Sequence, residues 1–450
     1  MLTTRTPARA LAALGLGTVA ALALAGCSGS PAGGIAPADI PGDLTKDVTV
    51  SFWHVYQGAD QAALDGLIQR FEEENPRITV DAQFTGGFAE QQKKLVSALQ
   101  AGDPPNLAIA YPADVLRYQE SRKVLNLTPY IEDDAHGLSE EDLEDVFEIE
   151  RTINRYEVAE GDYLSFPFTA NTMVMYYNED LLASAGISAP PETWDEFVAQ
   201  CATIKEELGL ACLSARGDGS SMDALAGAFG GVVKDDKGEP GVGEEAWTRM
   251  LEQLQELAEA GYAEVAGGAP GQVTGPDLQS FISQRAAFVL GTSRNIGFFP
   301  DSIGDAFAWG AAAPPQPEKT DAPVSVLYGP GVVAFSDDPQ KDLATWQLIR
   351  FLTGAEAQSI WATETGQLPV RASVAESEAF KARLQESPAR TVAFSLMTDA
   401  VWDGALGEHG VIEGVSQKER ELLASVMNAV LLGDMTAQQA QQQLQAGIGR

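Results

Sequence analysis

Histidine and cysteine are scarce in this sequence, with three of each among 450 residues. His54, His136 and His409 lie far apart, and no histidine stands near a cysteine at the short spacings of zinc sites. The sequence therefore argues against a transition-metal enzyme. It predicts neither a metal nor a cofactor.

Basic residues are also few. The chain has 29 Lys and Arg against 64 Asp and Glu, which gives a formal net charge of −35 at pH 7. A surface of this sign repels phosphate backbones and anionic headgroups over about 8 Å, the Debye length in physiological salt. Nucleic acid is therefore not expected as a partner.

Beyond the N-terminus there is no apolar run of about 18 residues, the length that indicates a membrane span. Hydrophobic residues make up 45% of the chain and charged residues 21%, a balance that favours compact folding over disorder. At roughly 150 residues per domain, the length predicts two or three domains.

The N-terminal segment 1–26 has the layout of an export signal. Arg5 and Arg9 precede an apolar stretch from Ala10 to Ala25. The segment ends in Leu24-Ala25-Gly26-Cys27, which resembles the lipobox of bacterial lipoproteins. This resemblance implies cleavage before Cys27, lipidation of its thiol and anchoring at the outer face of the cell membrane. The alternative is a transmembrane anchor or an ordinary secretory signal.

Residues 27–46 are rich in Gly, Pro, Ala and Ser, which is typical of a flexible tether. In an exported chain, Cys201 and Cys212 meet an oxidising compartment and are candidates for a disulfide. Cys201 also falls on the apolar face of a predicted helix with Trp194 and Phe197, so a buried free thiol is the alternative.

From Asp47 onward the chain alternates between strand and helix patterns. Val48, Val50 and Phe52 are spaced by two, as in a strand, and the apolar residues of 64–71 are spaced by three and four, as on a helix. The same alternation continues to residue 110 and predicts a parallel sheet. A second set begins near Met173, so the fold class is α/β.

Ligands of parallel sheets collect beyond the carboxyl ends of the strands. The predicted strand ends here carry the segments 53–57 and 85–88, and Tyr111.

Several segments together resemble one family. They are Val50–His54, Phe71–Pro76, Ala101–Asn106, Phe166–Phe168, Met175–Leu182, Pro191–Phe197, Phe281–Asn295 and Thr365–Arg371. In their order and spacing the chain resembles the extracellular solute-binding proteins of ATP-driven (ABC) importers, in the branch of maltose-binding and glycerol-3-phosphate-binding proteins.

The resemblance implies a two-lobed, periplasmic-binding-protein-like fold with a hinge and a ligand cleft between the lobes. We expect 47–164 and 312–354 to form lobe 1, and 165–311 and 355–450 to form lobe 2.

Sites for sugars and polyols pair aromatic platforms with planar polar groups. The aromatic candidates for this cleft are Trp53, Tyr56, Phe88, Tyr111 and Trp402, and the polar candidates are Gln57, Asn171, Asp218, Arg294 and Gln367. For each aromatic residue, packing in the core is the alternative.

The family's pattern adds further positions. Ser293 and Arg294 fall on a loop where the maltose-binding type has an aromatic residue and the glycerol-phosphate type has serines, and Arg294 departs from both. Gly329 matches a glycine that lets the backbone approach the ligand. Gln367 stands where the glycerol-phosphate binder has a tyrosine. Arg420 matches an arginine that contacts phosphate in that binder, although an ion pair at the surface is the alternative role.

The resemblance implies a binding lipoprotein that captures a carbohydrate or a glycerol-phosphate-type solute and delivers it to a membrane permease. It implies no catalysis. Two other classes stay open, a secreted carbohydrate-active enzyme and an adhesin or scaffold lipoprotein. The sequence contains no Gly-x-Ser-x-Gly elbow, Walker A loop or His-Glu-x-x-His motif.

Overall fold

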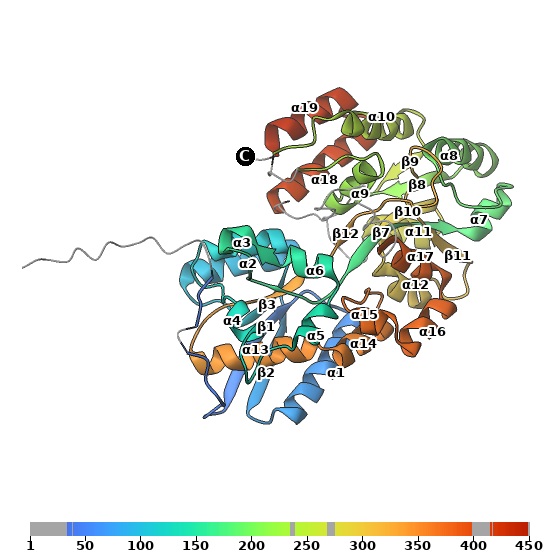
Figure 1. Ribbon diagram of the computed structural model, residues 1–450. Coiled ribbons are helices and arrows are strands. Elements are labelled where there is room, and N and C mark those ends of the chain that lie inside the picture. Colours follow the sequence, from blue (N-terminus) through green and yellow to red (C-terminus); the bar gives the residue numbers. More distant parts are fainter. Residues whose placement is uncertain are drawn as a thin grey trace, which may run out of the picture. The chain divides into compact units, whose positions relative to one another are not determined.

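The computed structural model describes residues 34–37, 39–234, 239–267, 275–397, 415 and 417–448. Its strands form two main sheets, each flanked by helices (Figure 1). The strands are β1 Val48–His54, β2 Ile78–Phe84, β3 Leu107–Ala110, β4 Arg155–Tyr156, β5 Asp162–Tyr163, β6 Phe166–Pro167, β7 Asn171–Asn178, β8 Ala211–Ala215, β9 Ala263–Val265, β10 Ala286–Thr292, β11 Trp309–Ala312, β12 Leu327–Tyr328 and β13 Gly331–Ala334.

The helices follow the predicted periodicity. At the start of α8, Thr193 and Glu196 form a capping box. The helices are α1 Ala59–Glu74, α2 Phe88–Ala101, α3 Pro112–Gln119, α4 Thr128–Ile131, α5 Glu140–Glu144, α6 Glu148–Ile153, α7 Glu179–Ser184, α8 Trp194–Leu208, α9 Gly219–Ala228, α10 Glu245–Glu259, α11 Pro276–Ile282, α12 Asn295–Ile303, α13 Pro339–Thr353, α14 Ala355–Glu364, α15 Ala372–Ala375, α16 Glu378–Glu386, α17 Pro388–Ser395, α18 Gln417–Leu431 and α19 Ala437–Gly447, with a 3-10 turn at Glu157–Ala159.

The first sheet has the strand order β2-β1-β3-β13-β6. β1 pairs in parallel with β2 and with β3, as the alternating pattern predicts, whereas β13 runs antiparallel to β3 and to β6. Because successive side chains point to opposite faces, Val50 and Phe52 are buried in one apolar cluster with α1 and α13, and Ala108 joins another with α2 and α3. The sheet is therefore covered by helices on both faces.

The second sheet has the order β11-β7-β10-β8-β9, and β12 also pairs with β7. β7 is antiparallel to β10 and β11, while β8 is parallel to β10 and β9. One face packs Met173 and Phe288 against α8, α9, α10, α18 and α19. The other packs Tyr176 and Val289 against α11, α12 and α17.

The chain passes between the sheets through short segments. Residues 168–170 join β6 of the first sheet to β7 of the second, and residues 329–330 join β12 of the second to β13 of the first. Two different loops thus connect the same two bodies. The lobe boundaries given above stay a prediction.

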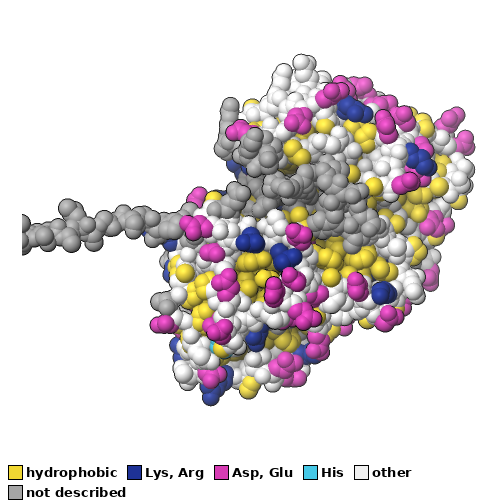
Figure 2. All heavy atoms as spheres, in the orientation of Figure 1, with side chains coloured by type: hydrophobic (Ala, Val, Ile, Leu, Met, Phe, Trp, Pro, Cys, Tyr) yellow, Lys and Arg dark blue, Asp and Glu magenta, His cyan; other side chains and the backbone are white. Residues whose placement is uncertain are grey.

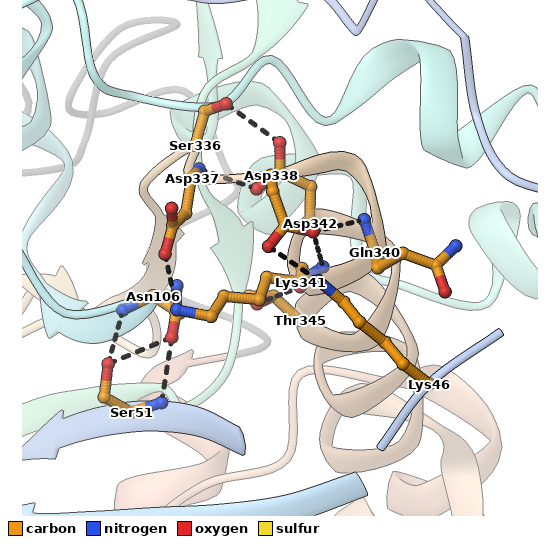
Figure 3. Close-up of polar contacts among 10 residues, drawn as sticks. All are labelled: Lys46, Ser51, Asn106, Ser336, Asp337, Asp338, Gln340, Lys341, Asp342 and Thr345. Atoms are coloured by element: carbon orange, nitrogen blue, oxygen red, sulfur yellow. Dashed lines mark hydrogen bonds and ion pairs between the residues drawn. The ribbon is translucent and has the colours of Figure 1, made fainter. Parts of the chain in front are cut away.

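Polar contacts cap the start of α13 and, separately, link β1 to the residue before β3 (Figure 3). Asp338 caps the helix by accepting hydrogen bonds from the backbone N–H groups of Gln340 and Lys341, at 2.9 and 3.2 Å. On β1, the Ser51 hydroxyl donates to Oδ1 of Asn106 at 3.0 Å and accepts from the Asn106 N–H at 2.9 Å. These contacts hold the first sheet together away from the cavity described below.

In the second sheet, Cys201 of α8 and Cys212 of β8 form a disulfide with a Cα–Cα distance of 4.9 Å. The bridge closes a segment with a sequence separation of 11. Since a cross-link restricts the unfolded chain, we expect the Cys201→Ser/Cys212→Ser protein to lose about 2–3 kcal/mol of unfolding free energy in urea titrations. The wild type in reducing buffer should match the variant. Equal stability of the variant and the oxidised wild type would show that the bridge contributes nothing.

Acidic side chains are scattered over the visible face of the molecule, with few basic ones among them (Figure 2). This distribution agrees with the net charge of −35. Among the described residues, no helix combines the length and the apolar character that crossing a membrane requires.

Candidate functional site: a cavity between the two sheets

A cavity lies between residues of the first and second sheets, with about 810 Å³ of empty space when the open solvent at its mouth is included. Its lining residues are Tyr56, Phe88, Tyr111, Thr169, Asn171, Met173, Arg216, Asp218, Ser220, Ser221, Asp277, Leu278, Leu290, Gly291, Thr292, Arg294, Asn295, Tyr328, Pro330 and Gln367. Seven of the predicted ligand-binding residues are in this set: Tyr56, Phe88, Tyr111, Asn171, Asp218, Arg294 and Gln367.

An aromatic pair from the first sheet forms one wall. Phe88 opens α2 and Tyr111 follows β3, and their ring centroids lie 4.5 Å apart at an interplanar angle of 35°. The guanidinium of Arg420, on α18, lies 4.5 Å from the centroid of the Tyr111 ring and donates a hydrogen bond to Ser220 Oγ at 3.2 Å. Burial raises the pKa of Tyr111 to about 12, so its hydroxyl stays protonated at neutral pH.

Tyr56 contributes a buried hydroxyl to the cavity. Its ring packs edge-on against Trp361, with the centroids 4.9 Å apart, and Arg294 Cζ lies 5.6 Å from its centroid. The hydroxyl has no hydrogen-bond partner among the described residues. Burial raises its pKa well above the usual value, so it remains a donor. A buried polar group without a partner is costly, and a ligand hydroxyl would satisfy it.

Amides and hydroxyls form the base of the cavity. Gln367 Oε1 accepts hydrogen bonds from Asn171 Nδ2 at 2.8 Å and from Thr169 Oγ1 at 2.9 Å. Asn171 Oδ1 in turn accepts from the hydroxyls of Thr292 and Ser293, both at 3.3 Å. This network fixes the orientation of the Asn171 and Gln367 amides.

An ion pair joins the two sheets at this base. Arg294, between β10 and α12, donates from Nε to Asp60 Oδ2 in the first turn of α1. Gln367 Nε2 donates to the same oxygen at 3.0 Å. Asp60 is only 6% exposed, and the sequence did not single it out. The sequence signal that could have identified Asp60 was its position at the start of α1, the helix that follows the end of β1.

A second ion pair lies in the part of the lining that the second sheet contributes. Arg216, just after β8, places Nε 3.3 Å from Oδ1 of Asp277. Asp218 is the N-cap of α9, and its Oδ1 accepts from the Ser221 N–H at 2.9 Å. Arg216 follows a strand end, the same rule that singled out Tyr111, but it was not predicted. Asp277 was not predicted either, because its pairing with Arg216 depends on the tertiary fold.

Other predicted residues lie outside this lining. Gln57 is exposed, and Trp53 is half-buried against an apolar cluster of α2 and α3. Ser293 is fully buried, and its hydroxyl donates a hydrogen bond to Asn171, which lines the cavity. A Cβ on Gly329 would lie 1.8 Å from the backbone oxygen of Thr169, so this glycine allows two chain segments to approach each other.

Two predicted residues, Cys27 and Trp402, lie outside the described residues. Within the described part of the chain, no group of three or more His, Cys, Asp or Glu side chains is arranged to hold a metal ion.

Residues 66–389 match the family model described as bacterial extracellular solute-binding protein, and the chain belongs to this family. The sn-glycerol-3-phosphate-binding periplasmic protein UgpB of Escherichia coli (strain K12) is 22% identical over 348 residues, which cover 73% of this chain and 76% of UgpB.

Solved structures show the same fold. The GacH receptor of Streptomyces glaucescens, solved unliganded and with acarbose, matches with a TM-score of 0.74 and 21% identity, over 88% of this chain and 96% of GacH. UgpB from Mycobacterium tuberculosis, in complex with glycerophosphocholine, matches with a TM-score of 0.73 and 18% identity, over 89% and 97%. The predicted two-lobed, periplasmic-binding-protein-like fold is thereby confirmed.

Proposed function

We propose that this protein is the solute-binding component of an ABC importer, which captures a carbohydrate or glycerol-phosphate-type solute outside the membrane and hands it to a permease. Membership of the solute-binding family supports this role. The relatives named above point to the same two solute classes: UgpB of Escherichia coli binds sn-glycerol 3-phosphate, GacH was solved with acarbose, and UgpB of Mycobacterium tuberculosis was solved with glycerophosphocholine.

The observation that carries the proposal is the composition of the cavity. Phe88 and Tyr111 bring partly exposed aromatic rings to the cavity from the first sheet, against which the apolar C–H face of a sugar packs, and the Tyr56 ring lies buried beside them. Asn171 and Asp218 offer polar groups from the second sheet, which accept and donate hydrogen bonds to hydroxyls. A polyhydroxylated solute matches both walls at once.

Binding in such a cavity favours the arrangement in which the two bodies approach each other. Ligand shifts this equilibrium only by the difference of its affinities for the two arrangements. A solute that touches Tyr111 and Asp218 together binds the closed arrangement more tightly than the open one, because the two residues come from different sheets. The permease would then recognise the closed arrangement.

The remaining parts of the proposal concern location and chemistry. We infer an extracytoplasmic protein held at the membrane by lipid on Cys27, as the lipobox-like segment predicts. We also infer that no bond of the solute is broken, and incubation with oligosaccharides should leave them intact. Newly formed products would favour the carbohydrate-active enzyme instead.

The test begins with a thermal-shift screen over sugars, polyols, glycerol 3-phosphate and glycerophosphodiesters. For the solute that stabilises most, we expect Tyr111→Ala to weaken binding about tenfold to a hundredfold in calorimetry, because the stacking platform is lost. Phe84→Ala is the matched control, since Phe84 is 43% exposed and does not line the cavity.

Equal affinity of the wild type and the folded Tyr111→Ala protein would contradict the site. The absence of any thermal shift would contradict solute binding altogether and would favour the adhesin or scaffold.

A further inference from the structure

The charged side chains of the cavity neutralise one another. Among the described lining residues, the charged ones are two arginines, Arg216 and Arg294, and two aspartates, Asp218 and Asp277. Arg216 pairs with Asp277, and Arg294 pairs with Asp60 just behind the lining. Arg216 and Arg294 side chains are only 8% and 12% exposed, and those of Asp277 and Asp60 are 7% and 8% exposed. Water therefore screens these pairs weakly.

Arg420, which the resemblance places at a phosphate-contacting position of the glycerol-phosphate binders, already has partners within the protein. Its guanidinium lies over the Tyr111 ring and donates to Ser220. It also lies in the field of Asp223, whose pKa burial raises to about 7 and Arg420 lowers in turn. The guanidinium therefore already has a ring face and a hydroxyl as partners.

Carboxylates of the chain itself lie in or next to the first turn of three helices at this site. Asp60 lies in the first turn of α1, Asp277 in the first turn of α11, and Asp218 is the N-cap of α9. A helix N-terminus carries partial positive charge and binds anions through its free N–H groups. At α9, the Asp218 carboxylate already accepts the N–H of Ser221.

We propose that Asp60 and Asp277 determine specificity in this cavity, because they mask Arg294 and Arg216 and so make the site select an uncharged polyhydroxylated solute over a phosphorylated one. This inference rests on the function proposed above and narrows its solute class. The two residues act through the arginines, by removing the positive charge that a phosphate group would require.

The physical reason is the charge of the competitor. A phosphate monoester carries about −1.5 to −2 at pH 7 and needs positive charge to replace its lost hydration. In this cavity it would meet Asp218 directly, and each arginine it approached would hold a carboxylate already. An uncharged sugar pays no such cost and uses the same groups as hydrogen-bond partners.

The experiment compares maltose, maltotriose, trehalose, glycerol 3-phosphate and glycerophosphocholine by calorimetry at pH 7.5. For the wild type we expect an uncharged sugar to bind about a hundredfold more tightly than glycerol 3-phosphate. In Asp60→Asn and in Asp277→Asn, we expect the affinity for glycerol 3-phosphate relative to that sugar to rise about tenfold, since one unit charge close to the phosphate is removed.

Asp434→Asn is the matched control, because Asp434 is exposed in the turn after α18, and its relative affinity should equal that of the wild type. Thermal stabilisation by inorganic phosphate is a second readout, expected in Asp60→Asn and Asp277→Asn and not in the wild type. The comparison of the five solutes on the wild type does not depend on whether any variant folds.

Preference of the wild type for glycerol 3-phosphate or glycerophosphocholine would overturn this inference and leave the transport role standing. Folded Asp60→Asn and Asp277→Asn proteins without any gain for phosphate would overturn the masking roles. If neither these five solutes nor any other solute of the thermal-shift screen binds, the proposed solute-binding function itself is overturned, and the inference with it.

Discussion

Replacing Arg294 by alanine should lower the free energy of unfolding by about 3 kcal/mol or more, because it leaves the buried Asp60 carboxylate without its cation. Among the described residues, Asp60 would keep the hydrogen bond from Gln367 Nε2 at 3.0 Å. Arg294 also lines the cavity, so solute affinity should fall as well. Urea titration followed by circular dichroism measures the first effect, and calorimetry measures the second.

Two further variants complete this experiment. The double variant Asp60→Asn/Arg294→Ala should recover much of the lost stability, since the uncompensated charge is gone. Arg285→Ala is the matched control, because Arg285 is exposed and its ion pair with Glu264 spans 3.8 Å. Such surface pairs contribute about 0–1 kcal/mol. If Arg294→Ala costs no more than Arg285→Ala, the cross-sheet ion pair does not stabilise the protein.

A second large effect is expected at Glu150, in α6. The side chain is 2% exposed, and its Oε1 has no hydrogen-bond partner among the described residues. Burial raises the pKa of this carboxyl from 4.5 to about 8. Between these two values the folded protein holds a proton that the unfolded chain releases, so this group makes stability fall as pH rises.

Glu150→Gln removes the titrating proton and keeps the shape. We expect the variant to be more stable than the wild type by about 2 kcal/mol or more at pH 9, with little difference at pH 5. Unfolding in urea at both pH values measures this. Glu148→Gln is the matched control on the same helix, because Glu148 is exposed. A stability difference between Glu150→Gln and wild type that is the same at pH 5 and pH 9 would show that Glu150 does not titrate in this range.

Much of the first sheet and part of the cavity followed from the order of strand ends in the sequence. Tyr56, Phe88 and Tyr111 were predicted there because parallel strands present their carboxyl ends at one edge. The same rule predicted Gln57 as a cavity residue together with Tyr56. Gln57 is exposed while its neighbour Tyr56 is buried, and only the three-dimensional path of the backbone decides which of two adjacent side chains faces inward.

The ion pairs could not be predicted in this way. Asp60 and Arg294 are 234 residues apart, and the chain passes to the second sheet before it reaches Arg294. In a chain with 64 acidic residues, nothing in the sequence distinguishes the few carboxylates that meet an arginine. Which carboxylates pair with an arginine depends on how α1, α11 and the strand ends come together in the fold. The lobe boundaries, the lipid on Cys27 and the role of Trp402 stay predictions.

The most direct test of the binding site is a crystal structure of the protein with the solute that gives the largest thermal shift. We expect that solute between the Tyr111 ring and Asp218, with one of its hydroxyls hydrogen-bonded to the Tyr56 hydroxyl. A solute bound elsewhere on the molecule, with this cavity filled only by water, would contradict the account.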